Sequence, residues 1–95
     1  MTLDDLYKII QERKEKMPAN SYVASLFREG KDRILQKVGE ESTEVIIAAK
    51  NESKERLTSE IADLLFHALV LLVNEDIKIS DILFELEKRN KRVKR

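Results

Sequence analysis

Two pairs of carboxylates are the residues of this chain whose types and spacing could do chemistry. The first pair is Glu41 and Glu44, and the second is Glu60 and Asp63. Residues three apart on an α-helix project from nearly the same side, with side-chain origins about 5–6 Å apart. Each pair could therefore offer two carboxylates to one site, provided that both segments are helical and lie side by side.

The first pair interrupts an apolar helical pattern. Spacings of four and three residues define a stripe at Ile34, Val38, position 41, Val45 and Ala48. Leu35, Ile46 and Ala49 widen this stripe. Position 41 should be apolar by this pattern, and it is Glu41, with Glu44 on the flank of the same stripe. Both carboxylates are expected to lean toward the interior side of their helix.

The second pair repeats this arrangement on the next segment. Its apolar stripe is expected at Leu57, Ile61, Leu64, Ala68 and Leu71. Glu60 and Asp63 lie along the edge of that stripe, and His67 follows on the same flank. A histidine on an apolar helix is more often a packed, hydrogen-bonded side chain than a ligand, so we interpret His67 as a supporting residue.

Four carboxylates in one half-buried space favour a bound cation. Desolvation and mutual repulsion would otherwise force the carboxylates to protonate or the chain to unfold. The chain has no cysteine, and an all-oxygen site suits magnesium or manganese better than zinc. Such an ion keeps positions open for phosphate oxygens, which predicts hydrolysis of a phosphoanhydride. The alternative is that these acidic residues are only solvated helix faces.

The elements that must position these residues are helices. With two glycines and one proline among 95 residues, the composition favours an all-α fold and one domain over residues 1–95. Helices are predicted over 3–16, 21–28, 31–50, 54–73 and from about 82 onward, with Thr2, Ser53 and Ser80-Asp81 as start signals. The short connection after residue 50 makes the two acidic helices antiparallel neighbours in a bundle of four to five helices.

The charge pattern excludes some partners. Eighteen basic and eighteen acidic side chains balance, which argues against a dedicated nucleic-acid binder. Six of the eight residues from Lys88 to Arg95 are basic, and we interpret this run as a solvated final helical turn rather than a polyanion-binding tail. The longest apolar stretch, 61–73, is interrupted by Asp63 and His67 and is expected to be too short to cross a membrane. A cytoplasmic protein is expected.

The blocks around both acidic pairs resemble the phosphoribosyl-ATP pyrophosphohydrolase family. They read Lys37-Val38-Gly39-Glu40-Glu41-Ser42-Thr43-Glu44 and Glu60-Ile61-Ala62-Asp63. This family belongs to the all-helical MazG-like nucleotide pyrophosphohydrolases, whose pattern is Glu-x-x-Glu followed later by Glu-x-x-Asp. The resemblance extends upstream over 21–27 and 32–37 and downstream over 81–86. Ser42 stands where the family would lead us to expect alanine.

The resemblance implies a reaction and a role for each site residue. Phosphoribosyl-ATP and water would give phosphoribosyl-AMP and pyrophosphate, with Mg²⁺ held by Glu41, Glu44, Glu60 and Asp63. In some organisms the family domain is fused to the cyclohydrolase that follows it, a metal enzyme with cysteine ligands. Because this chain has no cysteine, we expect the next step to belong to another polypeptide.

The phosphate-binding residues are predicted from position alone. Lys37 and Arg33 lie one and two turns before Glu41, and Lys50 ends the same helix. These three cations are candidates to hold the polyphosphate, although Arg33 and Lys37 could equally be surface cations paired with neighbouring carboxylates.

Two other functions remain open at this point. A housecleaning pyrophosphatase of (deoxy)nucleoside triphosphates would share the four carboxylates, and a non-enzymatic helical dimerisation module would leave Glu41 unexplained. A homodimer or a dimer of dimers is expected in either case. The helix over 54–73 is apolar on every side after Asp63, and a chain this short cannot readily cover all of it. Phe66 and Val70 are expected in this helix–helix interface.

Overall fold

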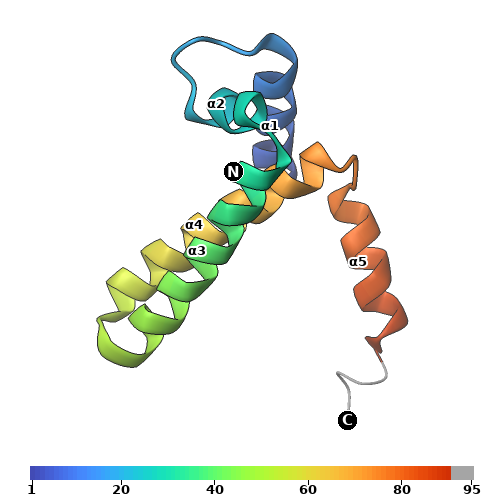
Figure 1. The fold of residues 1–95 in the computed structure, drawn as a ribbon. Coiled ribbons are helices and arrows are strands. Elements are labelled where there is room, and N and C mark those ends of the chain that lie inside the picture. Colours follow the sequence, from blue (N-terminus) through green and yellow to red (C-terminus); the bar gives the residue numbers. More distant parts are fainter. Residues whose placement is uncertain (91–95) are drawn as a thin grey trace.

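The computed structural model describes residues 1–90, and the whole of this part is helices and their connections. The five helices are α1 (Leu3–Lys16), α2 (Tyr22–Glu29), α3 (Lys31–Asn51), α4 (Lys54–Asn74) and α5 (Ile79–Lys88). Figure 1 shows α3 and α4 as a long hairpin, α1 and α2 at its upper end, and α5 pointing away. The predicted all-α fold is confirmed. The predicted role of the basic run depends on residues 91–95, which lie outside the described part.

The first helix begins where the sequence predicts. The backbone N–H of Asp5 donates to the Thr2 hydroxyl at 3.0 Å, and the backbone N–H of Thr2 donates to the Asp5 carboxylate at 2.9 Å. This reciprocal capping box satisfies two amides that have no partner inside the helix. The predicted helix over 3–16 is confirmed at both ends.

Gly30 separates α2 from α3. Its φ of 101° with ψ near 180° lies in a region that residues with a side chain rarely adopt. Its N–H donates to the carbonyl of Leu26 and so ends α2, while its carbonyl accepts from the N–H of Ile34 in α3. A single residue thereby redirects the chain onto the long helix that carries Glu41.

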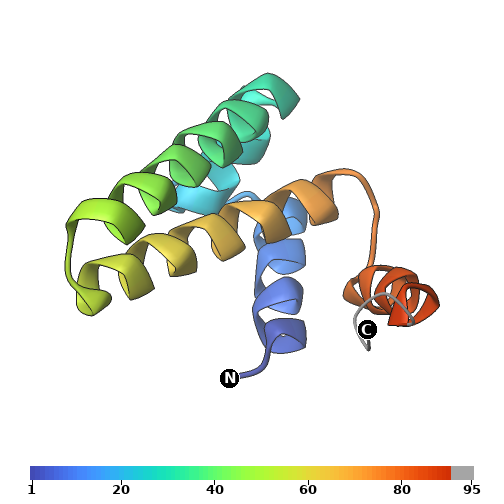
Figure 2. The same cartoon turned by 90° about the horizontal axis from the view of Figure 1, so that it is seen from below.

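The α3–α4 hairpin is antiparallel, as predicted, with only Glu52 and Ser53 between the two helices. The Ser53 hydroxyl accepts from the backbone N–H of Arg56 at 3.2 Å and caps α4. Figure 2, which views the molecule from below, shows the two helices lying next to each other from the connecting turn and spreading apart toward their other ends. Segments 41–44 and 60–63 therefore face each other across the pair.

The core lies at the upper end of the hairpin. Its largest fully buried side chains come one from each of the first four helices, namely Ile10, Leu26, Ile34 and Val70. Tyr7 joins this cluster, and its hydroxyl donates to the carbonyl of Ile77 at 2.7 Å, which ties α1 to the segment before α5. The lower half of the hairpin, beyond this core, is where the acidic residues lie.

The buried face of α4 differs from the predicted one. Glu60, His67 and Val70 are buried, whereas Ile61 of the predicted stripe is exposed. Because α4 is apolar on all sides after Asp63, hydrophobic periodicity cannot select the face that meets α3. Val70, expected in a dimer interface, is instead fully buried within the chain itself. On α3, Leu35 and Ile46, which were expected to widen the buried stripe, are exposed.

The start of α5 also differs from the prediction. The helix begins at Ile79 with Lys78 at the cap position, not at Ser80-Asp81. Asp81 lies in the first turn, where its carboxylate accepts from the backbone N–H of Lys78 at 2.9 Å. Asp81 is thus the third residue of the helix rather than its cap, and it takes the place of the acidic residue in a capping box. None of the residues of α5 is buried within the chain.

Helix α4 is long and apolar enough, by length and composition, to cross a membrane. The stretch 61–73 is too short to cross a membrane, as expected, but the whole helix of 21 residues is long enough. Glu60 and Asp63 lie near its middle, and carboxylates at that depth of a bilayer are costly. The burial of Glu60 and His67 against neighbouring helices fits a core helix better than a membrane span.

Candidate metal centre

Three carboxylates converge between the two long helices. One oxygen each from Glu41 of α3 and from Glu60 and Asp63 of α4 can be chosen so that all three lie within 4.8 Å of one another. The side chain of Glu41 is 12% exposed and that of Glu60 is 6% exposed, while Asp63 is open to solvent. The cluster therefore has a nearly buried floor and one accessible side.

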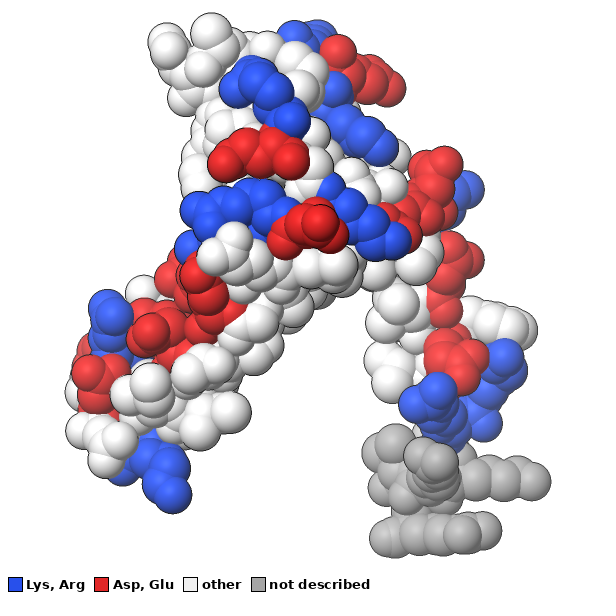
Figure 3. Space-filling model, in the orientation of Figure 1, with Lys and Arg blue, Asp and Glu red and all other residues white. Residues whose placement is uncertain are grey.

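The cluster lines an open hollow of about 460 Å³ on the hairpin. Its lining residues are Lys37, Glu40, Glu41, Glu44, Arg56, Glu60 and Asp63. Glu44 belongs to this lining, but it is exposed and lies outside the tight group of three carboxylates, so it leans less toward the interior than expected. Five acidic side chains against two basic ones leave an excess of negative charge, and Figure 3 shows acidic residues gathered along this hairpin.

Two cations balance part of this charge. Lys37 lies 3.3 Å from Glu41 and 3.5 Å from Glu40, and Arg56 lies 2.8 Å from Glu60. Burial is the strongest single influence on Lys37 and lowers its pKa. The hydrogen bond to Glu41 and the nearby negative charges together outweigh it, so the pKa of Lys37 lies above its ordinary value. Lys37 is therefore a permanent cation at the edge of the site.

The other two predicted phosphate-binding residues lie elsewhere. Arg33, one turn before Lys37, donates from Nη1 to the side-chain oxygen of Gln36 at 3.1 Å and does not line the hollow. Lys50 is exposed at the end of α3 and does not line it either. Of the three predicted cations, the structure brings only Lys37 to the carboxylates.

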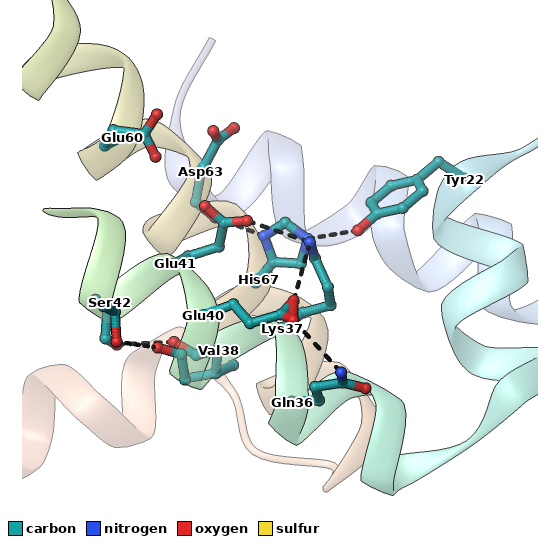
Figure 4. Close-up of polar contacts among 12 residues, drawn as sticks. Tyr22, Gln36, Lys37, Val38, Glu40, Glu41, Ser42, Glu60, Asp63 and His67 are labelled. Carbon is teal, nitrogen blue, oxygen red and sulfur yellow. Dashed lines mark hydrogen bonds and ion pairs between the residues drawn. The ribbon is translucent and has the colours of Figure 1, made fainter.

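His67 holds Tyr22 beside the acidic cluster (Figure 4). The Nδ1 atom of His67 lies 2.7 Å from the backbone carbonyl of Asp63, and a carbonyl only accepts, so Nδ1 carries a proton. In the neutral ring Nε2 must then accept the hydrogen bond of the Tyr22 hydroxyl at 2.8 Å. Burial is the main cause that raises the pKa of Tyr22, which keeps this hydroxyl protonated as a donor. These contacts fit the supporting role inferred for His67.

The donor set fits a hard divalent ion. Every candidate ligand is a carboxylate oxygen, and neither a thiolate nor a free imidazole nitrogen faces the cluster in the described part of the chain. Magnesium prefers such ligands and binds through a few carboxylates while it keeps several waters. The nearly buried Glu41 and Glu60 gain most from a cation, because their charges are poorly solvated.

Sequence reasoning missed two residues at this site. Arg56 lies four residues after Glu52 and four residues before Glu60. In the sequence this spacing looks the same as that of an ordinary ion pair on a helix surface. Tyr22 lies 45 residues from His67 in the chain, and in the sequence it stands out only as part of the segment 21–27 that resembles the family. The single signal for Tyr22 was the serine–tyrosine pair that starts α2.

Comparison with known proteins gives one family over the whole described part of the chain except its first two residues. A family model described as phosphoribosyl-ATP pyrophosphohydrolase matches residues 3–90. A phosphoribosyl-ATP pyrophosphatase of Clostridium botulinum is 55% identical over 96% of this chain and 83% of its own length. One from Saccharolobus solfataricus is 51% identical over 94% of this chain and 95% of its own length. The histidine biosynthesis bifunctional protein HisIE of Bacillus subtilis is 50% identical over 96% of this chain and 44% of its own length.

Proposed function

This chain belongs to the phosphoribosyl-ATP pyrophosphohydrolase family, and from that premise we propose how its acidic helix pair performs the family reaction. The enzyme hydrolyses phosphoribosyl-ATP to phosphoribosyl-AMP and pyrophosphate, a step of histidine biosynthesis. The observation that carries the proposal is the convergence of Glu41, Glu60 and Asp63 within 4.8 Å, inside the matched region.

Magnesium is the ion we propose for this cluster, with Glu41, Glu60 and Asp63 as ligands and Glu44 at the rim. When bound, it would neutralise negative charge that develops on the phosphate oxygens. A carboxylate that remains free orients the attacking water and accepts its proton. Lys37 holds a phosphate group at the edge of the hollow. His67 and Tyr22 keep α2 close to the turn of α4 that presents Asp63.

A thermal shift with magnesium tests the metal site and separates an enzyme from a mere dimerisation module. We expect Mg²⁺ at a hundred times its dissociation constant to stabilise the folded state by about 2.7 kcal/mol. For a chain of this size, that corresponds to a rise in Tm of roughly 10 °C or more. A scaffold without a metal site would not respond, and an equal response to Na⁺ at the same ionic strength would argue against a specific site.

A substrate panel tests the choice of nucleotide. We expect phosphoribosyl-ATP to be cleaved with a kcat/KM at least about a hundredfold above that for ATP, dCTP or dUTP, because a site built around its additional ribose phosphate would leave polar groups unpaired with the smaller nucleotides. Pyrophosphate release is the measurement. A clear preference for a deoxynucleotide would instead indicate the housecleaning function.

We propose that the protein forms a homodimer, or a dimer of such dimers, through α4 and α5. These helices and the start of α1 line an apolar groove of about 420 Å³ made by Leu3, Leu65, Ala68, Leu69, Leu71, Leu72, Ile79, Ile82, Leu83 and Leu86. A groove this apolar on a small protein is unfavourable in water. The same surface of a second copy would cover it in a two-fold interface. We also propose that the protein is cytoplasmic.

A further inference from the structure

Arg56 pairs with a carboxylate that the proposed metal would need. Its Nη2 atom lies 2.8 Å from Glu60, whose side chain is only 6% exposed. Its Nε atom lies 3.6 Å from Glu52, which is well exposed. The guanidinium thus joins a nearly buried carboxylate to a solvent-facing one, and the Arg56 side chain is itself 53% exposed. Because about half of its side chain faces solvent, the guanidinium has room to turn away from Glu60 without leaving the hollow.

The two cations of the hollow lie at opposite ends of the acidic cluster. Lys37 precedes Glu41 by one turn on α3, and Arg56 precedes Glu60 by one turn on α4. Because the two helices are antiparallel, these steps run in opposite directions. Lys37 lies 14 residues before the end of α3 and Arg56 lies two residues after the start of α4, so at 1.5 Å per residue the two backbone positions are about 18 Å apart along the hairpin. A polyphosphate laid across the cluster would meet one cation at each end.

Aromatic side chains mark only one of these ends. The Tyr22 hydroxyl is hydrogen-bonded to His67, and the Tyr22 ring stacks on Phe66 with 6.2 Å between ring centroids. Figure 4 shows Tyr22 and Glu60 at opposite sides, with Asp63 and Glu41 between them. A nucleoside triphosphate has a flat base at one end and its terminal phosphates at the other. The base end therefore fits beside Tyr22, and the terminal phosphates fit beside Arg56.

We propose that Arg56 is a displaceable counter-cation that becomes the pyrophosphate-binding residue. It neutralises Glu60 in the metal-free protein. With Glu60 engaged as a metal ligand, the guanidinium would turn to the β- and γ-phosphates, to which its planar fork can donate two hydrogen bonds. Water adds across the bond between the α- and β-phosphates, and the pyrophosphate leaves from the Arg56 end. This assignment rests on the magnesium site proposed above.

The first arm of the test is metal binding without substrate. Arg56→Gln removes the competing cation, so Mg²⁺ should bind about fivefold tighter than to the wild type in isothermal titration calorimetry. Lys54→Gln is the matched control, because it removes one positive charge from the same helical turn but Lys54 does not line the hollow. Its magnesium affinity should remain within about twofold of the wild type.

The second arm is product inhibition in saturating magnesium. Pyrophosphate should inhibit Arg56→Gln about tenfold more weakly than the wild type, whereas inhibition by AMP should not change. Arg56→Lys keeps the charge without the fork, so its pyrophosphate inhibition should fall between the two. This variant also supplies the measurement if Arg56→Gln does not fold.

Each failure has its own meaning. Wild-type protein that binds no magnesium would refute the proposed metal site, and the role of Arg56 with it. If the wild type binds magnesium but Arg56→Gln binds it no tighter, or if pyrophosphate inhibits this variant as before, the role of Arg56 alone is overturned. Equal weakening of AMP and pyrophosphate inhibition would likewise exclude a pyrophosphate-specific contact.

Discussion

Glu41→Gln and Asp63→Asn are each expected to lower the turnover of phosphoribosyl-ATP by about a thousandfold or more, because each removes a negative ligand from a cluster of three. A neutral amide of the same shape still packs but cannot hold a hard dication against water. Pyrophosphate release is the measurement. Near-wild-type release by either variant would remove these residues from the site.

The same two variants should fold at least as well as the wild type when magnesium is absent. Their carboxylates are crowded against Glu60, and replacing one of them relieves repulsion in a nearly buried place. Thermal unfolding in EDTA should show a Tm equal to or above that of the wild type, and added magnesium should no longer raise it. Glu55→Gln is the control, since Glu55 is exposed on α4 outside the hollow and should alter neither property.

Leu65→Glu and Leu83→Glu are each expected to dissociate the proposed dimer, with the dissociation constant raised by about a thousandfold or more. Both side chains line the apolar groove between α4 and α5 and are exposed in the protomer. Two-fold symmetry places two unpaired charges in the interface for each substitution, and each costs several kcal/mol when buried. Sedimentation at micromolar concentration should report monomers.

The protomer fold should survive these substitutions, because neither leucine belongs to the buried core. Ile9→Glu is the matched control: it places the same charge on α1 outside the groove and should leave the dimer intact. Val70→Glu is not suitable as an interface test, since Val70 is fully buried and a charge there would unfold the chain. Dimers of undiminished stability in both leucine variants would place the interface elsewhere.

Local signals determined the helices of this protein before any tertiary contact was known. Thr2 and Ser53 each mark a helix start, because a hydroxyl before a helical run can accept from an unpaired amide of the first turn. Gly30 marks the break between α2 and α3, since it adopts a positive φ without strain. Such interactions span three or four residues, so a linear pattern contains them completely.

The acidic cluster could also be predicted from the sequence in outline. Glu41 interrupts an otherwise regular apolar stripe, and a carboxylate at such a position is costly unless a cation compensates for it. The short connection between α3 and α4 then places Glu60 and Asp63 opposite. The sequence pattern could not distinguish Glu44 from the other three carboxylates. Residues one turn apart on a helix differ by a modest rotation about the helix axis, and this rotation decides whether a side chain faces the neighbouring helix or solvent.

Only the tertiary structure decided which face of α4 is buried and which cations reach the hollow. A helix that is apolar all round has no preferred face until its neighbours are placed. The sequence pattern therefore predicts Ile61 in the core and Val70 in an interface, whereas the structure exposes Ile61 and buries Val70. Arg56 and Lys50 are equally plausible as cations in sequence, but Arg56 reaches Glu60 and Lys50 does not line the hollow. Which cation reaches the hollow depends on how α3 and α4 are rotated relative to each other. Packing along the whole helix pair sets this rotation, and a short stretch of sequence does not contain it.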